Sequence, residues 1–229
     1  MSDFVHQLLF GIYPYVCLAV FLLGSLVRFE REQYTWKSDS SQMLRTGQLR
    51  WGSNLFHIGI LMLFFGHLIG LLMPADLYHA LGLSTEAKQM LAIVAGAIFG
   101  AMCLVGLILL VHRRLAEVRI RATSTGMDIF ILLWILATLA LGLVSIFFSL
   151  QHRDGSVMLL LAQWAQHIAT FRGGAADFIR EVPWIYKVHL FFGLTVFLLF
   201  PFSRLVHVWS GFAALSYLAR AYQIVRSRS

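Results

Sequence analysis

The sequence predicts an all-α integral membrane protein built as a bundle of five transmembrane helices. Hydrophobic residues make up 59% of its 229 positions and charged residues only 13%. A soluble domain is nearer half apolar and a quarter charged. Several apolar runs approach or exceed the ~20 residues with which a helix crosses the core of a bilayer. We treat residues 1–229 as a single membrane domain ending in a short tail, about residues 210–229.

The five predicted spans cover residues 4–27, 53–73, 89–111, 128–150 and 183–209. The first has too long an apolar run, with no basic region before it, for a signal peptide, so we expect a retained helix. The fifth contains Pro201, which should kink the helix and free one backbone carbonyl. We see no internal repeat, which argues against transporter folds built from duplicated halves.

Basic residues are distributed unequally among the loops, and this predicts the orientation. The first loop holds Arg28, Arg31, Lys37, Arg45 and Arg50, and the third holds Arg113, Arg114, Arg119 and Arg121. By contrast, no Lys or Arg precedes the first span, and the second loop has only Lys88. The positive-inside rule then places the N-terminus outside and the C-terminus in the cytoplasm. The net charge of +7 belongs to these loops and the tail, so we expect no nucleic-acid partner.

Four histidines lie inside the second and fifth spans, where a polar ring costs free energy unless something binds it. Because the two spans run in opposite directions, His57 and His207 share the cytoplasmic side, and His67 and His189 share the external side. Matched depths favour two haems, each held by one imidazole from each helix. Hydrogen bonds across the bundle are the alternative. Zinc is disfavoured because no carboxylate or cysteine at these depths could complete a tetrahedral site, and Cys17 and Cys103 have no metal-site spacing.

Neighbouring residues allow two interpretations each. Four glycines lie beside the histidines in the sequence: Gly59, Gly66, Gly70 and Gly193. They either make room for a flat macrocycle or allow helices to pack closely. Arg204, one turn before His207, either pairs with haem propionates or marks the end of the span by snorkelling. For Lys88, the residues alone favour a surface lysine over a hydrogen bond to a quinone oxygen.

Several longer motifs resemble the gamma chain of membrane-bound respiratory nitrate reductases. They are SSQML before the second span, SNLFHIGIL and GHLIGLL within it, RATSTGMDI before the fourth, FPFSRLVHVWS at the end of the fifth and YQIVRSR in the tail. The resemblance extends over nearly the whole chain and is most specific in the second and fifth spans.

The resemblance implies a five-helix cytochrome b of the bacterial inner membrane with two haems b, a periplasmic N-terminus and a cytoplasmic C-terminus. His57 and His207 would hold the proximal haem, and His67 and His189 the distal one. Lys88, Gly66 and His67 would contact a membrane quinol near the external face. The chain would oxidise this quinol and pass electrons to an iron–sulfur beta subunit, and an alpha subunit with molybdenum cofactor would reduce nitrate. Bis-imidazole ligation leaves no open iron position, so the chain itself would not bind nitrate.

Two other functions remain open at this point. The chain could be the diheme cytochrome b anchor of a different membrane-bound reductase, for example one of sulfur metabolism. Alternatively, it could be a haem-free membrane anchor or transporter whose histidines hydrogen-bond across the bundle.

Overall fold

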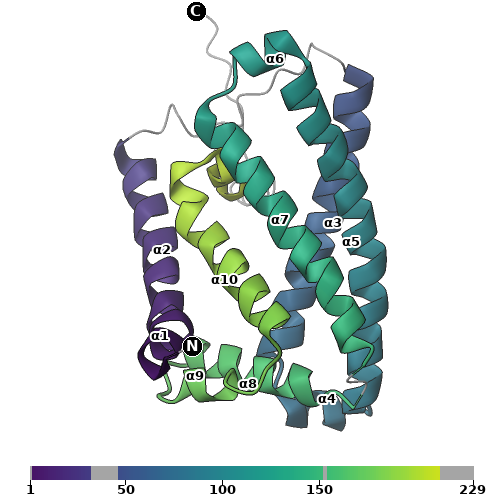
Figure 1. The fold of residues 1–229 in the computed structure, drawn as a ribbon, viewed down its shortest axis with the longest axis vertical. Helices are drawn as coiled ribbons and strands as arrows, with labels where there is room; N and C mark the ends of the chain where they lie inside the picture. The colour runs from purple at the N-terminus through teal and green to yellow at the C-terminus, as the bar shows by residue number, and fades with distance from the viewer. Residues whose placement is uncertain (1, 32–45, 152–153, 212–229) are drawn as a thin grey trace, which may run out of the picture.

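The computed structural model describes residues 2–31, 46–151 and 154–211, and these parts of the chain contain helices and no strand (Figure 1). Within these described ranges, five helical segments are long and apolar enough to cross a membrane: Asp3–Arg31, Thr46–Leu72, Thr85–Ala116, Gly126–Ser149 and Trp184–Phe202. The predicted fold class is therefore confirmed. Lys37, Arg45 and the predicted tail from residue 212 onward lie outside the described residues.

The first segment consists of α1 (Asp3–Gln7), the π-helix η1 (Leu8–Ile12) and α2 (Tyr13–Arg31). It begins at Ser2, whose side chain accepts a hydrogen bond from the Val5 backbone. Pro14 has no N–H to donate to the carbonyl of Phe10, four residues earlier. The indole Nε1 of Trp164 donates to that carbonyl instead, at 2.9 Å. The carbonyl that Pro14 leaves without a helical partner is thus hydrogen-bonded by a residue far away in the sequence.

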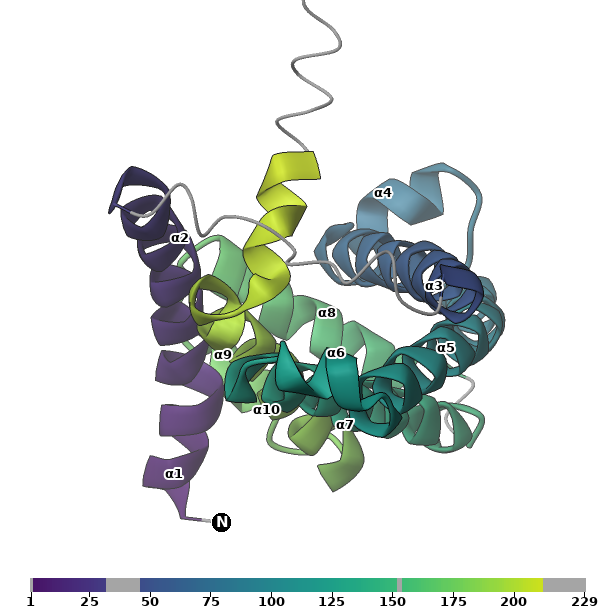
Figure 2. The same ribbon diagram turned by 90° about the horizontal axis from the view of Figure 1, so that it is seen from above.

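Helices α3 (Thr46–Leu72) and α5 (Thr85–Ala116) form the closest pair in the bundle. Glycines permit this approach, since a Cβ at Gly59 would lie 2.6 Å from the Cβ of Cys103. Of the two interpretations of Gly59, helix packing is therefore the correct one. Figure 2 shows these two helices side by side when the bundle is seen from above.

The fifth segment is shorter than the predicted span of residues 183–209. Helix α10 (Trp184–Leu199) ends just before Pro201, whose ring cannot continue the i to i−4 hydrogen bonding. Two 3₁₀ turns follow, η3 (Phe200–Phe202) and η4 (Arg204–Val206), separated by Ser203 in an extended conformation. The chain is helical again over residues 207–211. The expected kink is thus a complete break in the helix.

The break is held by a side chain from the first segment. Arg28 Nη1 donates to the carbonyl oxygens of Pro201, at 2.7 Å, and Ser203, at 2.9 Å. The carbonyl that Pro201 was expected to free, that of Phe197, accepts from the backbone N–H of Phe200. We call residues 200–206 the break segment.

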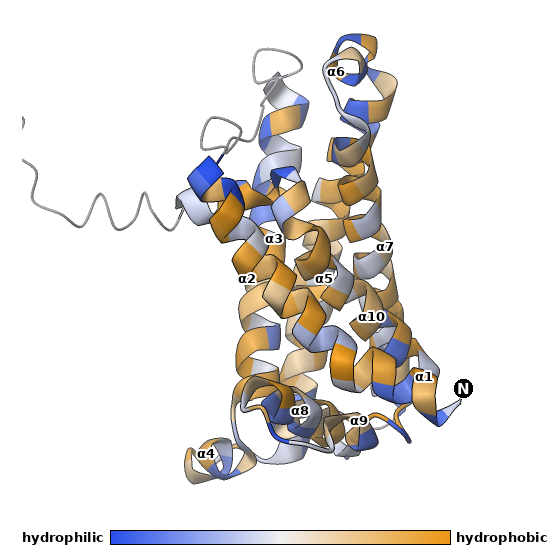
Figure 3. Ribbon diagram, turned by 90° about the vertical axis from the view of Figure 1, so that its left-hand side faces the viewer, coloured by the Kyte–Doolittle hydropathy of each residue, from blue (hydrophilic) through white to orange (hydrophobic). Residues whose placement is uncertain are grey.

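Helix α7 (Gly126–Ser149) packs between α5 and α10, and short helices occupy the connections. They are α4 (Ala75–Ala80), α6 (Val118–Ala122), α8 (Ser156–Ala169) and α9 (Ala175–Phe178). In Figure 1, α8 and α9 cross the base of the bundle, opposite the end with α6. Figure 3 shows apolar residues along the spans and hydrophilic ones gathered toward α6 and around α8 and α9.

Helix α8 closes the lower end of α3. Gln166 Nε2 donates to the carbonyls of Leu71 and Met73, at 3.2 and 3.3 Å, and so satisfies groups that the end of α3 leaves open. The sequence predicted only a long loop here.

Candidate functional site

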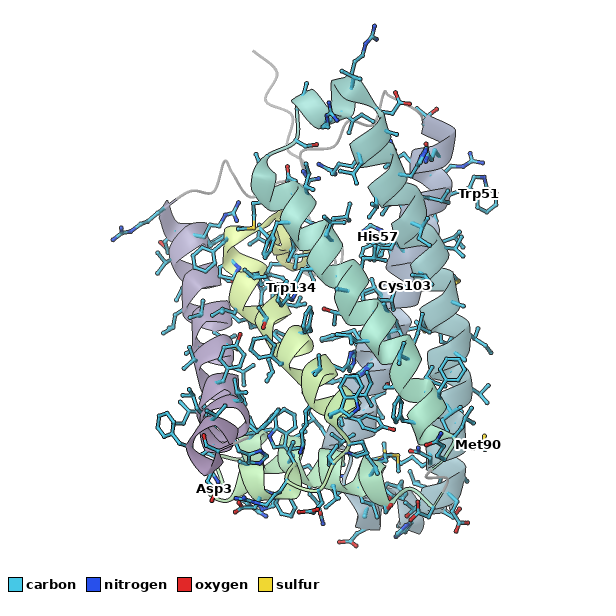
Figure 4. All side chains as sticks on the ribbon, viewed as in Figure 1. Asp3, Trp51, His57, Met90, Cys103 and Trp134 are labelled. Atoms are coloured by element: carbon cyan, nitrogen blue, oxygen red, sulfur yellow. The ribbon has the colours of Figure 1, made fainter. Side chains whose placement is uncertain are left out.

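The four histidines predicted to bind haem meet as two pairs, between α3 and the part of the chain that runs from α10 to residue 207. The rings of His57 and His207 have centroids 6.1 Å apart, and those of His67 and His189 are also 6.1 Å apart. We call these the first pair and the second pair. Figure 4 marks His57 in the half of the bundle that holds α6, above Met90 at the other end of α5. The two pairs thus lie one above the other along the bundle.

The spacing within each pair suits one metal ion held from both sides. A metal–imidazole nitrogen bond is about 2 Å, so two rings that share an ion have centres about 6 Å apart. Among the described residues, no three His, Cys, Asp or Glu side chains gather where they could hold a metal ion. Two imidazole nitrogens, one from each ring of a pair, are the donor set that a bis-imidazole haem requires.

Each of the four rings is held through Nδ1 by a main-chain carbonyl. The acceptors are Ser53 O for His57 at 2.7 Å, Leu63 O for His67 at 2.7 Å, Thr138 O for His189 at 3.1 Å and Arg204 O for His207 at 2.6 Å. A carbonyl oxygen can only accept, so Nδ1 carries the proton and Nε2 of the neutral ring keeps a free lone pair. This is the arrangement by which proteins orient histidines that ligate metals.

His207 lies just beyond the apolar segment, and its surroundings favour the neutral ring. Burial lowers the pKa of His207, since a charged imidazolium is poorly solvated there. The hydrogen bond to Arg204 O acts in the opposite direction and is outweighed. The lone pair on Nε2 is thus available at neutral pH.

Open space lies beside the second pair. A Cβ built at Gly66, Gly70 or Gly193 would meet no atom within 4 Å. The glycines next to His67 and His189 are therefore uncovered and would not obstruct a flat group against either helix. Together with the spacing of the rings, this is compatible with a haem.

Gly142 on α7 is a residue that the sequence did not single out. A Cβ at this position would lie 2.9 Å from Cε1 of His189, closer than ordinary carbon–carbon contact. The ring of His189 thus lies directly over Gly142, within reach of the carbonyl of Thr138 one turn earlier. A glycine in the middle of a strongly apolar helix was the only available signal.

Arg204 has a protein partner that the sequence did not predict. Its Nε donates to Oδ1 of Asp128, at the start of α7, at 2.8 Å. Arg114 Nη1 lies 3.7 Å from the other carboxylate oxygen, Oδ2. The guanidinium is therefore part of a partly buried ion-pair network close to the first pair.

Lys88 is buried, so the surface-lysine interpretation favoured by the residues alone is wrong. Only 7% of the residue is exposed, and its Nζ lies 4.2 Å from the centre of the Tyr78 ring. Tyr78 is itself buried and shares a hydrogen bond of 3.2 Å with Thr85 Oγ1. A buried ammonium over an aromatic face, at the end of α5 near α8, calls for a functional explanation.

Comparison with known proteins adds an independent line of evidence. The family model described as nitrate reductase gamma subunit matches residues 6–228. The chain is 50% identical to the respiratory nitrate reductase 1 gamma chain of Escherichia coli (strain K12), over 99% of both chains. It is 51% identical to the respiratory nitrate reductase 2 gamma chain of the same organism over the full length of both. It is also 38% identical to the nitrate reductase gamma chain of Bacillus subtilis (strain 168), over 97% of this chain and 99% of the other.

Proposed function

Because this chain belongs to the nitrate reductase gamma subunit family, we propose that it is the subunit that oxidises membrane quinol for a respiratory nitrate reductase. The observation that supports this most directly is the two histidine pairs, each with 6.1 Å between ring centres and each ring bonded through Nδ1 to a carbonyl. Two such pairs on helices that cross a membrane suit electron transfer from one side to the other.

The four histidines are proposed as axial ligands of two haems b. His57 and His207 would hold the haem nearer the cytoplasm, and His67 and His189 the one nearer the outside. A haem b held at each pair would supply reversible one-electron chemistry. The carbonyl acceptors fix the orientation of each ring and raise the basicity of its Nε2.

Lys88, Gly66 and His67 are proposed as the quinol site. The Lys88 ammonium is buried, so a hydrogen bond from it to a quinol oxygen would be charge-assisted and poorly screened. Gly66 leaves open space next to His67 for a flat ring. The site lies toward the predicted external side, and protons released there would leave the membrane on that side.

The remaining parts of the complex are proposed from the family. An iron–sulfur beta subunit and an alpha subunit with molybdenum cofactor would dock on the cytoplasmic face, where α6 presents Arg119 and Arg121. The chain would lie in the bacterial inner membrane, with its N-terminus in the periplasm and its C-terminus in the cytoplasm. This orientation follows from the basic first and third loops.

The deciding experiment is haem extraction and a reduced-minus-oxidised absorption spectrum of the complex purified with its partner subunits. We expect two b-type haems per chain. Replacing His67 or His189 by Ala should remove one haem and leave the other, because both residues belong to the second pair. A complex without haem would contradict the proposal and favour the haem-free anchor. Two haems without nitrate reduction by quinol would favour another reductase.

A further inference from the structure

The last histidine of the site, His207, lies directly after the break segment, where the chain becomes helical again. His207 follows η4, a single 3₁₀ turn bounded on its other side by extended Ser203. A turn this short cannot by itself fix the direction of a side chain as a long helix does. Contacts with other elements are therefore needed to hold this turn in place.

Two side chains from other helices supply these contacts. Arg28 of α2 binds the carbonyls of Pro201 and Ser203, which fixes the first part of the break segment. Asp128 of α7 accepts from Nε of Arg204 at 2.8 Å, which fixes the second part. The carbonyl of the same Arg204 accepts from Nδ1 of His207 at 2.6 Å. One residue thus joins the carboxylate on α7 to the imidazole.

The carboxylate is itself held rigidly. Its Oδ2 accepts from the backbone N–H of Thr125 at 3.0 Å, and the Thr125 hydroxyl accepts from the Asp128 N–H at 3.2 Å. This reciprocal capping box begins a helix of 24 residues. Asp128 is buried, so its bond to Arg204 is only weakly screened by water. The start of α7 therefore provides a fixed anchor for Arg204.

From this chain of contacts we infer that Asp128 is a positioning residue for His207: it holds Arg204 so that the Arg204 carbonyl orients the imidazole of the first pair. The inference rests on the proposed function, because it concerns the haem assigned to that pair. Asp128 would thus influence the ligand field and potential of the first-pair haem and leave those of the second-pair haem unchanged. His189, in the second pair, donates through Nδ1 to the carbonyl of Thr138, a contact in which Asp128 takes no part.

The test compares Asp128→Asn with the unaltered complex, purified with its partner subunits. Asn keeps the size of the side chain and one oxygen but loses the charge. We expect the electron paramagnetic resonance signal and the midpoint potential of the first-pair haem to shift, because a weaker bond from Arg204 to the uncharged side chain lets the Arg204 carbonyl, and with it the His207 ring, change orientation. The second-pair haem should be unchanged. His57→Ala and His67→Ala, each of which removes one haem, assign the signals.

Thr125→Ala is the matched control. It removes only the hydroxyl that accepts from the Asp128 N–H. The Thr125 backbone N–H still holds the Asp128 carboxylate, and the Asp128–Arg204 bond remains. The variant should therefore lower the unfolding temperature and leave both haem signals unaltered. If Asp128→Asn does not assemble, Arg204→Lys tests the same contact, since it keeps the charge and removes the Nε donor. That variant should likewise change the first-pair signal alone.

Three results would overturn the inference. They are an unchanged first-pair signal in Asp128→Asn, an equal disturbance of both haems, or the same shift in Thr125→Ala. These results all presuppose an unaltered complex with two haems. An unaltered complex without haem would instead refute the proposed function, and this inference with it.

Discussion

At the scale of single residues, the site depends on rings that are oriented by the main chain and on small residues that give those rings space. His189 is the clearest example, because its ring lies on Gly142 and is bonded to the carbonyl of Thr138. The position of the ring is thus determined by a helix other than the one that carries it. Substitutions on α7 should therefore change the position of the His189 ring in the second pair.

Gly142→Ala should displace His189. The new methyl group would lie 2.9 Å from Cε1, so the ring must move and weaken its bond to Thr138 O. We expect an altered absorption spectrum and potential for the second-pair haem, measured by redox titration of the complex. Gly126→Ala, on the same helix, is the control, since a Cβ there meets nothing within 4 Å. Identical spectra for the two variants would contradict this account of Gly142.

Lys88→Ala should weaken quinol binding while both haems remain. Loss of a hydrogen bond from a charged donor costs about 1.5–3 kcal/mol, which corresponds to a rise in quinol KM of roughly 10- to 150-fold. The measurement is steady-state quinol oxidation together with haem content. Lys187→Ala is the control, because Lys187 donates to the carbonyl of Arg180 in an exposed position. Unchanged KM and turnover in Lys88→Ala would leave the buried ammonium without a role in binding.

The residues of the site were only partly predictable. The pairing of His57 with His207 and of His67 with His189 follows from two helices of opposite direction, which hydropathy alone indicates. Gly142, Asp128 and Tyr78 were missed, because their roles depend on how α7 and the α4–α5 connection are rotated toward the histidines. Such rotations are set by tertiary packing, and the hydropathy of a fully apolar helix carries no information about them.

At the scale of elements, the break segment is the most unusual part of the fold. Pro201 ends α10, and Arg28 then binds two of the carbonyls exposed by the break. A Cβ at Gly24, one turn before Arg28, would lie 2.8 Å from Cγ of Pro201, so α2 fits closely against the break. The first and last segments are therefore joined at the end of the bundle that carries the first pair.

Arg28→Met should destabilise this junction. The change keeps much of the apolar stem and removes hydrogen bonds to two carbonyls, each worth about 1.5–3 kcal/mol when the donor is charged. We expect a lower unfolding temperature in detergent, followed by circular dichroism, and a changed first-pair haem signal. Arg31→Met, at the exposed end of α2, should have little effect. Equal effects of the two substitutions would mean that the contact with the break segment is unimportant.

The elements themselves were predicted unevenly. The four predicted spans that begin at residues 4, 53, 89 and 128 correspond to helices, although α3 and α5 extend further toward the predicted cytoplasmic side. Helix α8 was not predicted, since its 14 residues are too few for a span and its apolar run lies inside a long loop. Its place under the bundle comes from contacts such as those of Trp164 and Gln166. These contacts are far apart in sequence, so local patterns could not reveal them.

At the scale of the whole molecule, composition and the length of the apolar runs were enough to give the fold class. If all five candidate segments of the described residues cross the membrane, the two ends of the chain are predicted to lie on opposite sides. The orientation is a prediction from charge, because the described basic residues of the first and third loops lie at one end of the bundle and Lys88 lies at the other.

Reporter fusions test this orientation. A reporter active only in the cytoplasm should be active when fused after Ser229, and one active only in the periplasm should be active at the N-terminus. Fusions to the α8–α9 connection should behave as periplasmic. Activity of the cytoplasmic reporter at the N-terminus would invert the scheme and place the second pair on the cytoplasmic side.

The main-chain acceptors of the four imidazoles have a consequence for how the protein can change over time. Every amino acid has a main-chain carbonyl. Leu63 or Thr138 could therefore be replaced by many other amino acids without altering which ring nitrogen carries the proton. The side chains at these carbonyl-bearing positions can then be substituted freely. Substitution is restricted instead at residues that keep the backbone in place. Tolerance to substitution in this protein should therefore follow the helix path and not the distance from the histidines.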